Sequence, residues 1–114
     1  MILNKEQLDI ARNLLSSSSR LFTLTVRGDS MEPTIKKGQA IKVLPICLKQ
    51  EDIKIGDIIV YKNCLDHFTI HRVIRILRKK SKNKLYITKG DNNKRNDRYI
   101  VSSSNIVAIF PNDD

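Results

Sequence analysis

A serine in a constrained turn, Ser30, has a side chain that could act in catalysis. Ser30 follows Gly28, which permits a sharp change of backbone direction, and precedes Pro33, which restricts the backbone beyond it. A serine hydroxyl becomes an effective nucleophile only when a neighbouring base removes its proton during attack. Turns also collect serine for conformational reasons, so Ser30 alone does not establish a catalytic role.

Histidine and aspartate side chains elsewhere in the chain could complete such a site. His71 lies within a strongly β-forming segment, where an isolated histidine is commonly a structural residue. His67 lies four positions earlier, about 13 Å away along an extended strand, so only one of the two can serve Ser30. Asp91 and Asp97 follow in a segment rich in Gly, Asp and Asn. Taken alone, both are more typical of turn residues that bind their own backbone.

Chemistry between these residues requires a sheet that brings distant segments together. Short runs of alternating or continuous apolar residues predict strands at 21–27, 40–44, 58–62, 69–77, 84–89 and 106–110. All four glycines lie next to a predicted turn. Short strands at this spacing predict a mainly β fold, namely a small antiparallel, partly closed barrel or sandwich.

A helix is predicted before the first strand. Asn4 is a helix-capping residue with Gln7 three positions later, and the apolar residues that follow fall on one helical face. We expect this helix to pack on one end of the sheet. The predicted organisation is therefore an N-terminal helix within residues 1–20 and a single catalytic β domain in residues 21–114.

The composition is that of a small, basic globular domain. The chain has 114 residues, and hydrophobic residues make up 40% of them, enough for a core. Lys and Arg number 21 against 12 Asp and Glu, a net charge of +9. A positive net charge of this size favours nucleic acid, an anionic membrane or an acidic peptide as partner. The alternative interpretation is a basic surface that contacts only solvent. Segment 75–84 carries six basic residues but no aromatics for base stacking, so we do not expect a nucleic-acid partner.

Neither a membrane span nor a metal site is predicted from the sequence. No segment approaches the roughly 20 apolar residues that span a bilayer, and polar residues occupy N-terminal positions where a signal peptide is apolar. We therefore expect a cytoplasmic location. Cys47 and Cys64 have no CxxC partner, and in a cytoplasmic chain we expect both to be reduced, small apolar residues. We expect no metal and no cofactor.

Together, these segments resemble the type I signal peptidase family, within the superfamily that includes LexA-like self-cleaving repressors. Four boxes occur in the order and at the spacing of the family: 30–33 as nucleophile box, 56–60 as a glycine-aspartate strand, 70–74 as general-base box and 89–93 as the last box. Any one of these is a weak signal, whereas four in order make a specific one. The resemblance implies a sheet of the LexA and signal peptidase type.

The residue at position 71 indicates the branch of the family. Bacterial signal peptidases and LexA-like proteins place a lysine there, whereas the endoplasmic-reticulum and archaeal type places histidine followed by Arg-Val-Ile, as here. The resemblance implies His71 as the general base for Ser30. It implies Asp97 as the acid that completes the triad and Asp91 as a secondary acidic residue. Many members carry a serine where this chain has Gly28, which leaves the Ser30 backbone N–H as the local oxyanion donor.

The resemblance implies a serine endopeptidase that cleaves a leader or signal segment from a precursor peptide or protein. The substrate is expected to lie extended along a strand edge, with small residues near the cut. Because family members usually work beside a membrane, we expect the basic surface to contact anionic lipid peripherally or a membrane-bound partner to tether the chain. Two alternatives stay open. One is a self-cleaving LexA-like regulatory domain, although no Ala-Gly or Cys-Gly pair precedes Ser30; the other is a non-catalytic binding module that uses the basic face.

Overall fold

An antiparallel sheet makes up most of the chain that the structure describes. The computed structural model describes residues 21–49, 52–63, 65–78 and 84–111. Its elements are β1 (Phe22–Thr25), β2 (Ala40–Pro45), η1 (Ile46–Leu48), β3 (Ile58–Lys62), β4 (Phe68–Arg78), β5 (Lys84–Lys89), β6 (Val101–Ser102), η2 (Ser103–Asn105) and β7 (Ile106–Phe110), where η marks a short 3-10 helix. The mainly β prediction is confirmed. The predicted N-terminal helix, and with it the domain division at residue 20, lies outside the described residues.

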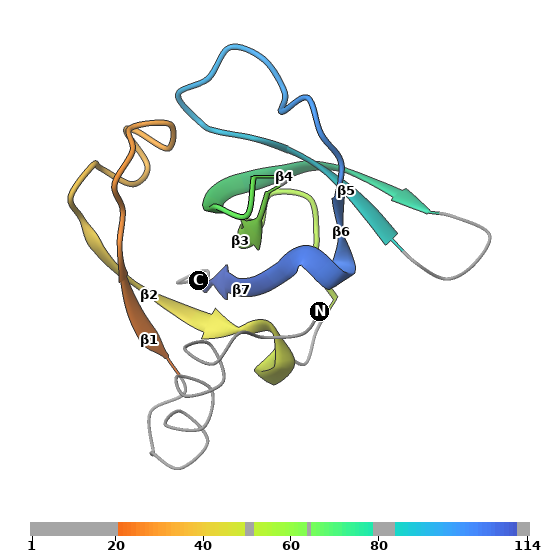
Figure 1. The fold of residues 1–114 in the computed structure, drawn as a ribbon, viewed down its shortest axis with the longest axis horizontal. Helices are drawn as coiled ribbons and strands as arrows, with labels where there is room; N and C mark the ends of the chain where they lie inside the picture. The colour runs from red at the N-terminus through yellow and green to blue at the C-terminus, as the bar shows by residue number, and fades with distance from the viewer. Residues whose placement is uncertain (1–20, 50–51, 64, 79–83, 112–114) are drawn as a thin grey trace.

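The strands form one sheet in the order β1-β2-β7-β3-β4-β5-β6, with neighbouring strands antiparallel (Figure 1). β2 changes partner along its length, because residues 40–43 pair with β1 whereas Leu44 and Pro45 pair with β7. The sheet therefore bends there, and in Figure 1 the β1–β2 ribbon stands apart from the β4–β5 ribbon. Because β1 and β6 end the strand order, the strands that the structure describes form an open sheet.

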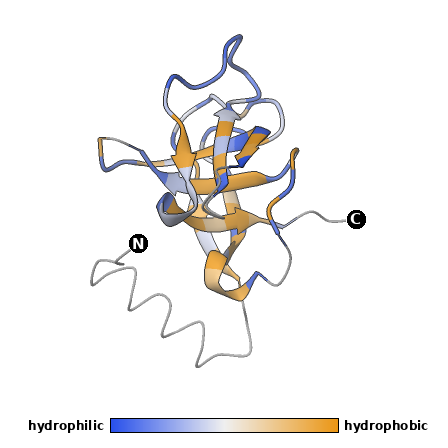
Figure 2. Cartoon of the chain, turned by 90° about the vertical axis from the view of Figure 1, so that its right-hand side faces the viewer, coloured by the Kyte–Doolittle hydropathy of each residue, from blue (hydrophilic) through white to orange (hydrophobic). Residues whose placement is uncertain are grey.

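β3 lies at the centre of the sheet and is buried on both faces. Alternate residues of a strand point to opposite faces, so Ile58 and Val60 join one hydrophobic cluster while Ile59 and Tyr61 join another. This explains why the strand is a continuous apolar run instead of an alternating one. Figure 2 shows hydrophobic residues concentrated in the strands and hydrophilic residues in the loops.

Most predicted strands occur close to their expected bounds. Those at 58–62, 84–89 and 106–110 coincide with β3, β5 and β7, whereas β6 and both 3-10 helices were not predicted. Cys47, in η1, is a free and exposed cysteine, and Cys64 lies outside the described residues. Within the described ranges, no helix has the length and apolar character needed to cross a membrane.

Candidate active site

The turn that carries Ser30 follows β1 and is anchored in the core by apolar side chains. Met31 is 1% exposed and Ile35 is fully buried, and the Ile35 N–H donates to the Met31 carbonyl at 2.9 Å. The Glu32 N–H closes the start of the turn on the Asp29 carbonyl at 3.1 Å. Because Met31 and Ile35 are held inside, the partly buried Ser30 is left at the rim of the sheet.

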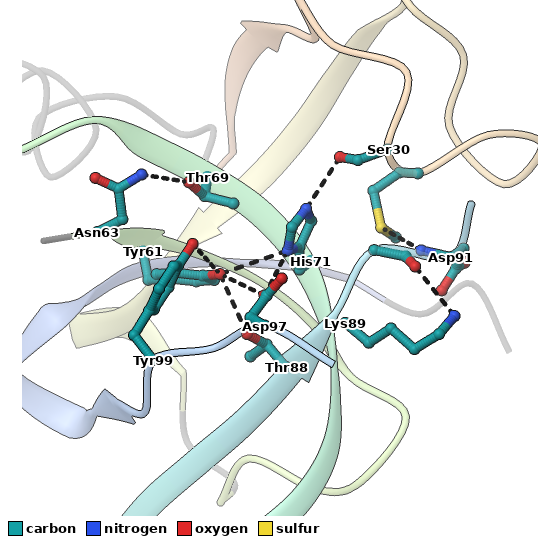
Figure 3. Close-up of polar contacts among 12 residues, drawn as sticks. Ser30, Tyr61, Asn63, Thr69, His71, Thr88, Lys89, Asp91, Asp97 and Tyr99 are labelled. Carbon is teal, nitrogen blue, oxygen red and sulfur yellow. Dashed lines mark hydrogen bonds and ion pairs between the residues drawn. The ribbon is translucent and has the colours of Figure 1, made fainter. Parts of the chain in front are cut away.

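His71 reaches Ser30 from β4. It pairs with Ile59 of the central strand β3 and is 6% exposed. Its Nε2 atom lies 3.0 Å from Ser30 Oγ, although 41 positions separate the two residues (Figure 3). His67, the other histidine, is exposed, and its backbone N–H donates to Asn63 Oδ1 in the turn before β4. Of the two histidines, therefore, only His71 contacts the serine.

Asp97 binds the other ring nitrogen of His71. Its backbone N–H donates to the Thr88 carbonyl at 2.8 Å, which holds the segment after β5 against that strand. Its Oδ2 atom lies 2.6 Å from His71 Nδ1. Because an ionised carboxylate can only accept, Nδ1 carries the hydrogen and Nε2 presents its lone pair to Ser30. Burial raises the pKa of Asp97, but hydrogen bonds from His71 and Thr88 outweigh it and hold that pKa below its usual value.

The same carboxylate oxygen accepts two further hydrogen bonds from buried hydroxyls. Thr88 Oγ1 donates at 2.6 Å and Tyr61 OH at 2.9 Å, and both side chains are fully buried. Burial raises the pKa of Tyr61 far above its ordinary value, so its hydroxyl stays protonated and can donate. Oδ2 of the ionised Asp97 thus accepts three hydrogen bonds inside the protein.

Asp91, the secondary acidic candidate, does not contact His71. Its carboxylate forms a two-pronged pair with Arg72, at 2.9 Å from Nε and 2.8 Å from Nη2. Thr34 Oγ1 donates to the same carboxylate at 2.5 Å, and Arg72 Nη1 donates to the Gly56 carbonyl at 2.7 Å. The hydrogen bonds from Arg72 hold the pKa of Asp91 below its usual value, against the effect of burial, and Thr34 adds to them. Asp91 therefore ties the nucleophile turn to β4.

The loop after β5 also touches the backbone of the nucleophile turn. The Asn92 N–H donates to the Ser30 carbonyl at 2.7 Å, and Asn92 Nδ2 donates to the Asp29 carbonyl at 3.1 Å. Gly90 packs so closely that a Cβ atom there would lie 2.7 Å from the Ser30 carbonyl oxygen. Among the described residues, no acceptor binds the backbone N–H of Ser30 itself, so that donor is available to an incoming oxygen.

An open, mainly apolar groove of about 790 Å³ adjoins the serine. Ser30 is one of its lining residues, together with Leu24 from β1 and Phe68 and Ile70 from the start of β4. β1 ends the strand order, so its outer edge has no partner strand among the described residues. The groove thus adjoins the Ser30 hydroxyl and offers an apolar surface that includes residues of β1.

Comparison with known proteins identifies the family. The sequence model of the Peptidase S24-like family matches residues 2–109. The chain belongs to the Peptidase S24-like family. Similar curated proteins are catalytic subunits of the signal peptidase complex: one from Ogataea parapolymorpha is 37% identical over 84 residues, covering 65% of this chain and 46% of the relative. One from Homo sapiens is 33% identical over 86 residues, covering 75% of this chain and 43% of the relative. This chain thus spans less than half the length of these relatives, and the predicted resemblance to signal peptidases is confirmed.

The supporting contacts of this Peptidase S24-like site were not predicted from its sequence. Ser30, His71 and Asp97 are brought together, and Asp91 is placed beside them on a separate pair of contacts. Tyr61 was missed because it lies within an apolar strand, where the signal is only that a buried tyrosine hydroxyl needs a partner. In the described part of the chain, no three His, Cys, Asp or Glu side chains are grouped to hold a metal ion.

Proposed function

We propose that this chain is a serine endopeptidase of the signal peptidase type, which cleaves a leader or signal segment from a precursor peptide or protein. The observation that supports it most is the continuous line of contacts from Ser30 Oγ through both nitrogens of His71 to Asp97, at 3.0 and 2.6 Å. These are the distances at which a proton can move from a hydroxyl to an imidazole oriented by a carboxylate.

In the proposed reaction, Ser30 Oγ attacks the carbonyl carbon of the scissile bond while its proton passes to His71 Nε2. Asp97 holds the ring in the tautomer that accepts this proton and stabilises the imidazolium that forms. The Ser30 backbone N–H donates to the oxyanion of the tetrahedral intermediate. When the intermediate collapses, the imidazolium protonates the leaving amine. A water molecule then hydrolyses the acyl-enzyme with His71 again as the base.

The substrate is proposed to bind as an extended segment beside β1. The outer edge of β1 offers backbone groups for strand addition, and the groove beside it offers an apolar surface on which side chains of the bound segment can pack. The family resemblance adds that residues next to the scissile bond are small. An apolar leader followed by small residues therefore fits this site.

A tether at the membrane is part of the proposal. The similar proteins are named as catalytic subunits of a signal peptidase complex, which supports a protein partner for this chain, and we propose that this partner is membrane-bound. Peripheral contact with anionic lipid is the other route, with about 1 kcal/mol from each suitably placed basic residue. Arg75 and Arg78 are exposed on β4 and are available for such contact.

Cleavage of a synthetic precursor peptide, followed by mass spectrometry, tests the proposal. Ser30→Ala and His71→Ala should each abolish cleavage and leave the fold intact, whereas His67→Ala, in an exposed turn, should cleave as the unaltered chain does. Cleavage that persists in Ser30→Ala removes the assignment. The mass of the purified chain after incubation tests for self-cleavage, because a persistent full-length mass argues against it. Salt-sensitive binding without Ser30-dependent cleavage would instead identify a binding module.

A further inference from the structure

Two buried hydroxyls converge on the one oxygen of Asp97 that binds His71. Thr88 Oγ1 and Tyr61 OH both lie within hydrogen-bond distance of Asp97 Oδ2, at 2.6 and 2.9 Å. His71 Nδ1 approaches the same atom at 2.6 Å. Oδ2 of Asp97 is therefore approached by three donors, and Figure 3 shows Tyr61 and Thr88 grouped with Asp97 on the side of the His71 ring away from Ser30.

The register of three neighbouring strands produces this grouping. Tyr61 of β3 pairs with Thr69 of β4, and Thr88 of β5 pairs with Val73 of β4. His71 lies on β4 between these two positions, and residues two apart on a strand share a face. The strands on either side of β4 thus each place one hydroxyl on the face to which the His71 ring points.

The direction of both hydrogen bonds follows from the available partners. Tyr61 OH has longer contacts to Thr88 Oγ1 at 3.1 Å, to Tyr99 OH at 3.4 Å and to His71 Nδ1 at 3.5 Å. An ionised carboxylate is the strongest acceptor among these groups, and each hydroxyl has a single hydrogen to give. Tyr61 and Thr88 therefore both donate to Asp97.

We propose that Tyr61 and Thr88 are positioning residues that weaken the pull of Asp97 on the His71 proton. Each donated hydrogen places the positive end of a dipole beside the carboxylate, close to the ring that becomes positive. The imidazolium is then stabilised less than it would be by a bare carboxylate. The catalytic meaning of this arrangement rests on the proposed function, but the arrangement itself is a property of the folded chain.

Among the described residues, the other titratable groups near His71 do not donate a hydrogen bond to Asp97. Tyr99 is the other hydroxyl that contacts the cluster, through Tyr61 and not through Asp97. Charged groups on the elements packed around β4 have partners of their own: Arg72 with Asp91, Lys89 with the Gly90 carbonyl, Asp57 with the Lys54 N–H, and Glu32 with the Lys37 N–H. Variation of the two hydroxyls is thus a direct test.

The test is an NMR titration of the His71 imidazole in the full chain, with and without the two hydroxyls. In Tyr61→Phe and in Thr88→Val, each of nearly unchanged shape, the midpoint of the titration should move to higher pH by about 0.5 unit or more, and further in the double variant. Tyr86→Phe is the matched control, because Tyr86 is buried in the same hydrophobic cluster as Tyr61 and its hydroxyl binds Ser103 instead of Asp97. A midpoint in both single variants equal to that of Tyr86→Phe overturns the proposal.

Kinetics provide a second, independent readout. The acid limb of the pH profile of kcat/KM should move upward in Tyr61→Phe and Thr88→Val by the same amount as the titration midpoint. A fall in kcat/KM with an unmoved acid limb would show a merely structural role and overturn the proposal. Because the titration needs no cleavage, an inactive chain whose midpoints shift as expected would remove the proposed function and leave this inference standing.

Discussion

The backbone of Ser30 lies directly against Gly90. A Cβ atom added at Gly90 would lie 2.7 Å from the Ser30 carbonyl oxygen and 3.0 Å from the Ser30 Cβ. The same carbonyl accepts the Asn92 N–H at 2.7 Å, so the loop after β5 contacts it at two points. The missing side chain at position 90 thus helps to set the distance between the turn that carries Ser30 and the loop after β5.

Gly90→Ala is expected to displace the nucleophile turn. The new methyl group meets the Asn93 side chain and, in Ser30, the carbonyl oxygen and Cβ, and these two Ser30 atoms cannot move aside without carrying Oγ away from His71. Misplacement of about 1 Å lowers catalysis by about 100-fold, so we expect kcat/KM to fall 10- to 100-fold. Gly28→Ala is the control, because a Cβ there meets nothing within 4 Å. Peptide cleavage rates and thermal unfolding measure both, and a Gly90→Ala protein as active as Gly28→Ala contradicts the expectation.

Asp97→Asn is expected to lower kcat by about 1,000- to 10,000-fold. The amide has no charge to stabilise the imidazolium, and its NH2 group favours the wrong tautomer of His71. Steady-state kinetics at saturating peptide measure the loss, and circular dichroism checks the fold. Asp66→Asn is the matched control, since Asp66 is exposed and has a φ of 61°, which asparagine also adopts. Near-normal kcat in Asp97→Asn would assign the orienting role to another group.

The strands of this sheet were predictable where the chain gives a long enough pattern. β3 and β5 have the predicted bounds because a run of adjacent apolar residues marks each of them, four residues long in β3 and three in β5. β6 contains only Val101 and Ser102. Two residues carry no periodicity, and their strand conformation depends on pairing with Leu85 and Tyr86, far away in the chain. Only the folded sheet defines that strand.

The candidate site likewise has residues that could be predicted from their type and contacts that depend on how the strands and loops pair in the fold. Ser30, His71 and Asp97 could be named from the sequence because their types and boxes carry the chemistry. The partner of Asp91 could not be named, because its pairing with Arg72 depends on how the loop after β5 folds back over β4. Contacts of this kind follow from register and loop path, and no spacing along the chain encodes them.

Asp91→Asn is expected to change the acid stability of the fold. Hydrogen bonds from Arg72 hold the pKa of Asp91 below its ordinary value of 3.8. As the pH falls below about 4, the unfolded chain takes up a proton at this carboxyl before the folded one does, so its stabilising effect is complete above that pH and lost below it. We expect the variant to lose about 1 kcal/mol of unfolding free energy at pH 7. Its stability should then fall less steeply between about pH 5 and 2.5.

Urea unfolding at a series of pH values measures this slope. Asp52→Asn is the control, because Asp52 is 86% exposed at the side chain and contacts Lys84 at 3.4 Å, a surface pair that contributes little. A pH dependence of Asp91→Asn that matches the unaltered chain would show that the pair with Arg72 adds nothing to stability.

Phe68→Asp is expected to weaken substrate binding more than the chemical step. Phe68 lines the groove beside Ser30 and is 51% exposed, so its replacement disturbs little of the core. A charge there removes apolar contact with the bound leader, and burial of an aromatic side chain contributes about 1.5 to 3 kcal/mol. We therefore expect KM to rise about 10-fold or more with kcat changed less than about 3-fold. Leu65→Asp adds the same charge three positions earlier, outside the groove lining, and should leave KM unchanged. Equal KM values for the two variants would place the leader somewhere other than this groove.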